Sequence, residues 1–100
     1  MFMSKGKVDF GELIHQLRTD KGWSQKKVAD KLGIDISLLS KIEHGERFVQ
    51  AHMIKPLSEI FNLDYRTMQV QLLSQQLEEE FGEQPFIEEA VSQFLNERVK

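Results

Sequence analysis

Residues 23–47 read WSQKKVADKLGIDISLLSKIEHGER, and this stretch decides the fold. Ser24 is a favourable N-cap for one helix, and Gly33 ends that helix because glycine adopts a positive φ without strain. Asp35 is placed to cap a second helix, which ends at Gly45. The positions expected to face inward are Val28, Ala29 and Leu32 on the first helix and Leu39 and Ile42 on the second. The pattern predicts two short amphipathic helices joined by a turn of about three residues.

A longer helix is predicted before this pair. Asp9 is a good N-cap, Glu12 stands three residues later as in a capping box, and Gly22 provides a stop. The inward-facing positions of this helix are Phe10, Leu13, Ile14 and Leu17, which have the spacing of one buried helix face. We expect residues 1–8, which precede it, to form a flexible arm.

Three more helices are predicted after the pair. The first covers about residues 51–61, and Pro56 within it either kinks the helix or delays its start to near Lys55. The second is capped by Asp64 and broken at Gly82, and its apolar stripe thins toward the C-terminal end. The last starts at Gln84-Pro85, because proline is favoured in a first helical turn. Since no strand pattern of useful length is present, the chain is predicted to be all-α.

The composition is that of one globular domain, with 100 residues, 40% of them hydrophobic and 29% charged. The absence of cysteine excludes disulfides and thiolate metal sites. There is no signal-peptide pattern and no apolar run near the length of a membrane span, so we expect a cytoplasmic protein without membrane contact.

The charges are unevenly distributed around a net charge of −3. Residues 15–55 hold eight Lys or Arg and five Asp or Glu, whereas residues 56–100 hold three and nine. A mildly basic half joined to an acidic half suits a nucleic-acid-binding protein with a separate assembly segment. Chance patchiness of surface charge explains the same distribution equally well.

Residues 23–47 resemble the helix-turn-helix of the Cro/CI-type (XRE) family. The matching positions are Leu17-Arg18, Gly22, Ser24-Gln25, Ala29, Leu32-Gly33-Ile34, Ser37, Leu39-Ser40-Lys41-Ile42-Glu43 and Gly45. The resemblance runs from about residue 10 to residue 73. It implies a five-helix, lambda-repressor-like DNA-binding domain over residues 9–73, whose third helix enters the major groove of double-stranded DNA. Residues 74–100 are then a C-terminal extension of one or two helices.

This extension is similar to the extra helices of small family members that accompany restriction-modification systems. Its apolar side chains either form a homodimer interface, together with residues 63–73, or fold back onto the domain as core. The side chains concerned are Phe86, Ile87, Val91, Phe94 and Leu95.

The resemblance implies base contacts from the outward face of the third helix, at Ile36, Ser37, Ser40 and Lys41. Lys41 is suited to guanine, the serines to a base edge or a phosphate, and Ile36 to a thymine methyl group. Ile36 departs from the family pattern, because many relatives carry Arg, Gln or Asn there. We therefore expect less hydrogen-bond readout and more reliance on DNA shape and methyl contacts.

Phosphate contacts are expected on either side of that face. Ser24 and Gln25 open a helix whose N-terminus attracts anions, and in the family Gln25 also braces the start of the third helix. His44 and Arg47, just past the third helix, are candidates for the other strand. For the remaining lysines of the second helix we expect a solvated face in preference to DNA contact; they are Lys26, Lys27 and Lys31.

The resemblance also implies a partly buried ion pair between Arg18 and Glu43, which ties the first helix to the end of the third. Unrelated surface charges are the alternative. No catalytic or metal site is expected, because the histidines lack metal-ligand spacing and the run Glu78-Glu79-Glu80 reads as a solvated face. We expect no cofactor.

Three functions are compatible with these features. The first is a homodimeric transcription regulator, activator or repressor, that reads a palindromic operator. The second is an antitoxin-like protein that binds an operator and grips a protein partner through its C-terminal segment. The third is a protein-interaction module without DNA binding, which salt-dependent DNA affinity would distinguish from the others.

Overall fold

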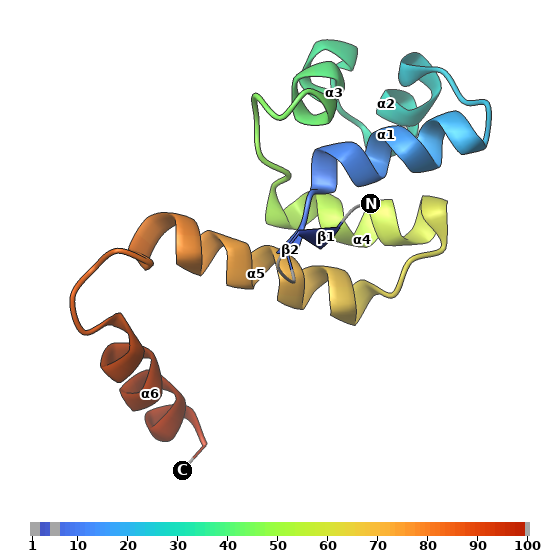
Figure 1. Ribbon diagram of the computed structural model, residues 1–100. Helices are drawn as coiled ribbons and strands as arrows, with labels where there is room; N and C mark the ends of the chain where they lie inside the picture. Colours follow the sequence, from blue (N-terminus) through green and yellow to red (C-terminus); the bar gives the residue numbers. More distant parts are fainter. Residues whose placement is uncertain (1–2, 5–6, 100) are drawn as a thin grey trace.

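The computed structural model describes residues 3–4 and 7–99. Over that part of the chain six helices follow two very short strands (Figure 1). The elements in order are β1 (Met3–Ser4), β2 (Lys7–Val8), α1 (Phe10–Asp20), α2 (Gln25–Leu32), α3 (Ile36–Glu43), α4 (Ala51–Phe61), α5 (Tyr65–Phe81) and α6 (Ile87–Arg98). The all-α prediction, five helices with an extension, is confirmed.

Local capping accounts for where three of these helices begin. The side chains of Asp9, Ser24 and Asp64 accept hydrogen bonds from backbone N–H groups three residues later, at 3.1, 3.0 and 3.0 Å. Such caps satisfy N–H groups that have no partner inside the helix. Asp35 occupies the N-cap position of α3, but its side chain makes no capping bond. Gly33 ends α2 in the left-handed conformation, with φ of 69°.

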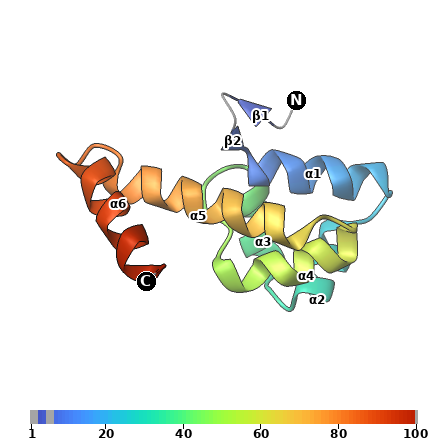
Figure 2. The same cartoon turned by 90° about the horizontal axis from the view of Figure 1, so that it is seen from below.

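The core lies between α1, α2, α3, α4 and the first half of α5. Its largest fully buried side chains are Ile14, Val28, Leu39, Ile42, Met53 and Ile54. Figure 2 shows α5 leaving this group and α6 standing apart from it. The chain is accordingly elongated, with extents of 45 × 27 × 24 Å.

The N-terminal segment differs from the flexible arm that we expected. Met3–Ser4 pairs antiparallel with Lys7–Val8, and the Val8 side chain is buried in the core. The Gln75 side chain of α5 donates a hydrogen bond to the Val8 carbonyl oxygen. Residues 3–4 and 7–8 are therefore paired through their backbones, and Val8 is anchored in the core. Residues 1, 2, 5 and 6 lie outside the described residues.

Two helix boundaries also correct the prediction. α4 runs through Pro56 from Ala51, so a start near Lys55 is wrong. α6 begins at Ile87 instead of Pro85, because Phe86 adopts the left-handed conformation, with φ of 67°, and serves as the N-cap.

The extension does not form core. α5 continues without a break across residue 73, where we placed the domain boundary, and α6 contains no buried residue. Phe94 and Leu95 are 57% and 53% exposed. Of the two roles expected for the tail, folding back as core is therefore wrong for this chain on its own.

Candidate nucleic-acid interface

α3 presents two different faces. Leu39 and Ile42 are buried against α1 and α2, whereas Ile36, in the first turn, is 49% exposed. Ser37 and Lys41 are exposed on the side away from the core, and Ser40 is half-buried. Among the described residues, neither the Ser37 hydroxyl nor the Lys41 ammonium has a hydrogen-bond partner. The four residues predicted to contact bases thus lie on the outward part of one short helix.

The side chains expected to contact phosphates differ in how far they are already engaged within the protein. Ser24 caps α2, and its Oγ already accepts from the Lys27 N–H. The His44 ring turns back onto α3, where Nδ1 lies 2.7 Å from the Ser40 carbonyl oxygen. Of the two ring nitrogens of His44, Nε2 is therefore the one available for a contact with DNA. Arg47 is exposed in the loop after α3.

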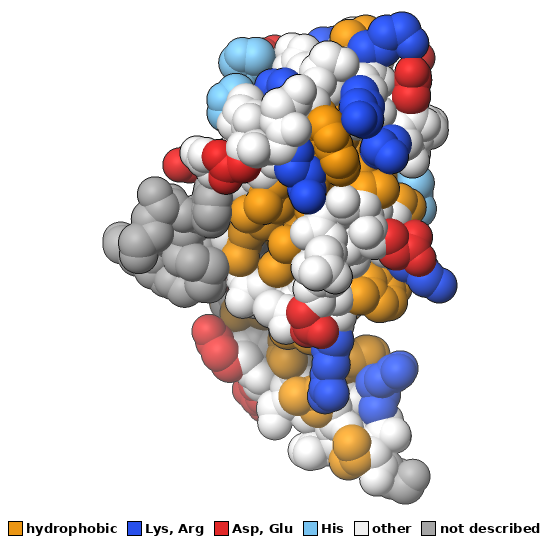
Figure 3. Space-filling view, turned by 90° about the vertical axis from the view of Figure 1, so that its right-hand side faces the viewer, with side chains coloured by type: hydrophobic (Ala, Val, Ile, Leu, Met, Phe, Trp, Pro, Cys, Tyr) orange, Lys and Arg blue, Asp and Glu red, His pale blue; other side chains and the backbone are white. Residues whose placement is uncertain are grey.

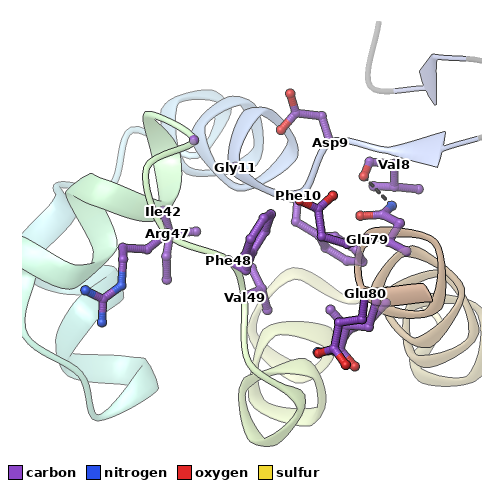
Figure 4. A pocket seen from close by; sticks show the side chains of 14 residues that line it. Val8, Asp9, Phe10, Gly11, Ile42, Arg47, Phe48, Val49, Glu79 and Glu80 are labelled. Atoms are coloured by element: carbon purple, nitrogen blue, oxygen red, sulfur yellow. Dashed lines mark hydrogen bonds between the residues drawn. The ribbon is translucent and has the colours of Figure 1, made fainter. Parts of the chain in front are cut away.

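In the loop between α3 and α4, the side chains of Arg47 and Phe48 point in different directions. A pocket of about 510 Å³ lies between the start of α1, the loop and α5. In Figure 4 Phe48 points into this pocket toward Phe10, while the Arg47 guanidinium points away from it. Arg47 is nonetheless a lining residue of the pocket as well as the candidate phosphate contact.

Arg18 and Glu43 form a two-pronged ion pair between α1 and α3. Arg18 Nε donates to Glu43 Oε2 at 2.8 Å, and its Nη2 donates to Oε1 at 3.0 Å. Arg18 Nη1 also donates to the Trp23 carbonyl oxygen at 2.9 Å. The Arg18 and Glu43 side chains are 12% and 2% exposed, so the pair is nearly removed from solvent. It fixes the last turn of the candidate reading helix to α1.

Gln25 joins this ion pair and does not brace the start of α3. Its Nε2 donates to Glu43 Oε1 at 3.3 Å, at the C-terminal end of α3. The family resemblance implied that Gln25 braces the start of α3, and this is wrong. The Gln25 side chain contacts the end of α3, because α2 crosses α3 so that the start of α2 lies beside the end of α3. His15, which sequence reasoning missed, lies in the same cluster with Nδ1 3.0 Å from Glu43 Oε1.

The cluster lowers the pKa of Glu43. Burial by itself would raise the pKa of this carboxyl, since it disfavours the charged form. Hydrogen bonds from Arg18, His15 and Gln25, together with the charge of Arg18, outweigh burial and bring the pKa below its ordinary value. Glu43 is thus a buried carboxylate that gathers donors from α1 and α2.

Gly11 allows α1 to approach the end of α3 closely. A Cβ added at this position would collide with the Ile42 carbonyl oxygen and lie 3.3 Å from the Glu43 carbonyl oxygen. Gly11 is buried in the first turn of α1. A glycine inside a helical pattern is a signal of close packing, but the sequence analysis assigned no role to Gly11.

The described residues contain no cluster of His, Cys, Asp or Glu suited to a metal ion. No helix among them is long and apolar enough to span a membrane.

Comparison with known proteins agrees with this geometry. The profile of a helix-turn-helix domain family matches residues 11–75. The uncharacterized HTH-type transcriptional regulator YazB of Bacillus subtilis (strain 168) is 35% identical over 54 residues, which are 54% of this chain and 78% of YazB. The HTH-type transcriptional regulator RamB of Mycobacterium tuberculosis is 37% identical over 62 residues, which are 62% of this chain but 13% of RamB.

A solved structure of a SinR protein/SinI protein complex contains a chain of the same fold. The TM-score is 0.52 at 21% sequence identity, and the alignment covers 88% of this chain and 92% of that chain. At this identity the likeness concerns the fold alone. With the family match over residues 11–75 and the identity to YazB, this chain belongs to the helix-turn-helix family of DNA-binding transcription regulators, of the Cro/CI (XRE) type.

Proposed function

We propose that the protein acts as a homodimer that reads a palindromic operator, with α3 of each subunit in the major groove. The observation that carries this proposal is the division of α3 into a face locked to the core and a face open to solvent. A helix held by buried leucine and isoleucine and by an ion pair at its last turn is rigid enough to present side chains at fixed positions.

Each residue on the open face has a distinct expected role. Lys41 donates to guanine O6 or N7, Ser37 and Ser40 bond base edges or nearby phosphates, and Ile36 packs on a thymine methyl group. Each good base contact contributes about 1–3 kcal/mol of discrimination against a wrong base.

The phosphate contacts come from both ends of the unit. The first turn of α2 offers backbone N–H groups beside Ser24, where the helix dipole is positive. Gln25 contributes through its backbone N–H, since its side chain is engaged with Glu43. Arg47 and the free Nε2 of His44 serve the other strand of the duplex.

Two features support dimerisation: the small size of the reading face of α3, and the exposed apolar surface of α5 and α6. One such domain makes few contacts, and two reading helices about 34 Å apart would engage successive turns of the same face of the duplex. α5 exposes an apolar stripe on the side away from Leu72, formed by Val70, Leu73, Leu77 and Phe81. With the exposed apolar residues of α6, this stripe is the candidate interface between subunits.

Selection of bound duplexes from a random DNA pool tests the proposal. A palindromic product would support DNA reading and dimerisation together, and failure to enrich any sequence would overturn the proposal. Ser37→Ala and Lys41→Ala should each weaken binding to the selected duplex by about 1–3 kcal/mol without changing the melting temperature. Lys55→Ala, which removes an exposed lysine of α4, is the matched control and should bind normally.

A second candidate function is an operator-binding protein whose C-terminal helices bind a different protein. The observation favouring it is that α6 buries none of its side chains. Light scattering on the purified chain separates the two, because a monomeric protein would favour a different partner and a dimer would favour a second copy. The link to restriction-modification systems stays a prediction.

A further inference from the structure

Three lysines surround the single tryptophan of the chain. The ammonium groups of Lys21, Lys27 and Lys31 lie 5.2, 5.0 and 5.3 Å from the centre of the Trp23 ring. The ring itself packs against Phe61, with centroids 5.7 Å apart. We call these three lysines and Trp23 the corner patch, because Lys21 and Trp23 lie where the chain turns from α1 into α2, while Lys27 and Lys31 follow within α2.

The corner patch carries uncompensated positive charge. All three lysines are exposed, and none forms an ion pair with a described residue. Lys26, on the same helix, differs because its ammonium pairs with Asp30 at 2.8 Å. The lysines of α2 are exposed, as expected from the sequence, but Lys27 and Lys31 also lie beside the Trp23 ring.

The tryptophan ring orders these lysines without neutralising them. Attraction between an ammonium and the face of an indole restricts the long side chain while its N–H donors stay available. The three like charges repel one another, so an anion that enters between them is favoured. Side chains that are already ordered lose less entropy when they bind a ligand.

The place of the patch in the fold indicates which anion it meets. It adjoins Ser24, at the end of α2 to which the proposed function assigns phosphate contacts. In Figure 1 the α1–α2 corner lies at the edge of the domain opposite the C-terminal helices. Figure 3 views this edge and shows lysine and arginine side chains gathered around hydrophobic surface in the upper part of the molecule.

We propose that the corner patch grips the phosphate backbone of DNA that flanks the operator half-site, outside the bases read by α3. The inference rests on the proposed function, because a dimer joined through α5 and α6 would carry its two corner patches on the outside. Continuity with the N-terminus of α2 favours a DNA phosphate row over an acidic protein segment. The patch would add affinity that depends on salt and not on base sequence.

Two duplexes and two variants test this inference. One duplex holds only the selected operator, and the other extends it by about one helical turn, about 10 bp, on each side. Wild-type protein should bind the longer duplex more tightly, with a log–log salt slope steeper by about 0.9 for each added phosphate contact. The triple variant Lys21→Gln, Lys27→Gln, Lys31→Gln should lose this advantage, whereas Lys26→Gln should keep it.

Binding of the triple variant to the short duplex at wild-type affinity would show that it is folded. Since Trp23 is the only tryptophan, its fluorescence is a second measurement, which should change more on the longer duplex. Equal wild-type affinity for both duplexes would overturn the inference, as would an equal loss in the Lys26 variant. Failure of wild type to bind either duplex would instead overturn the proposed function itself.

Discussion

α3 and α6 are both amphipathic helices, but the fold treats them in opposite ways. α3 has eight residues and places Leu39 and Ile42 in the core at 0% and 1% exposure. α6 has 12 residues and buries none of them. Isolated helices shorter than about 12–15 residues are marginal in water, so neither is stabilised by length alone. The difference teaches that α3 is held by the rest of its own chain, whereas α6 leaves most of its apolar side chains exposed.

The largest expected effect comes from breaking the ion pair that holds α3. Arg18→Ala leaves Glu43 charged at 2% exposure without its main partner, and such a loss typically costs about 3–5 kcal/mol of unfolding free energy. Urea unfolding measures it. Lys26→Ala is the control, because it removes an exposed ion pair and should leave the midpoint unchanged. If the two variants unfold alike, the pair does not hold α3.

A smaller loss is expected where α1 touches the end of α3. Gly11→Ala would gain helix propensity of about 1 kcal/mol. The new Cβ collides with the Ile42 backbone, and overpacking of this kind usually costs about 1–3 kcal/mol, so a net loss of stability is expected. Thermal unfolding measures the change. An increase in melting temperature would show that the two helices are not held at this distance.

Acid should loosen α3 through Glu43. Because the pKa of Glu43 is lowered in the folded protein, its stabilisation is fully present above the ordinary glutamate pKa of about 4.3. This stabilisation is lost as the pH falls through the lowered value. Between about pH 7 and about pH 3 the wild type should therefore lose more unfolding free energy than Glu43→Gln does. Equal losses in both proteins would contradict the assigned role of Glu43.

The smallest effect on stability is expected in α6. Phe94→Glu changes a side chain that is 57% exposed, so the urea midpoint should stay within experimental error of wild type. Its particle mass measured by light scattering should nevertheless fall from dimer to monomer. Asn96→Glu, which adds the same charge at an exposed polar position of α6, should remain dimeric. A dimeric Phe94 variant would remove this residue from the interface.

Some features of the site could be predicted because their causes are local. The outward position of Ser37 and Lys41 follows from the helical period once Leu39 and Ile42 are assigned to the core. The direction of Gln25 was not predictable in this way, because it depends on how α2 crosses α3. The meeting of His15 with Glu43 joins residues 28 positions apart, and no pattern in the sequence marks it.

The sequence by itself determined where α1, α2 and α5 begin and which helix faces are apolar. Asp9, Ser24 and Asp64 cap within three residues, and periodicity acts within a turn or two, so neither needs the rest of the fold. The tertiary structure decided that Glu43 collects donors from two other helices, that lysines gather around Trp23, and that α6 stays uncovered. These features depend on the angles and distances at which helices cross, which are set by the packing of the whole core.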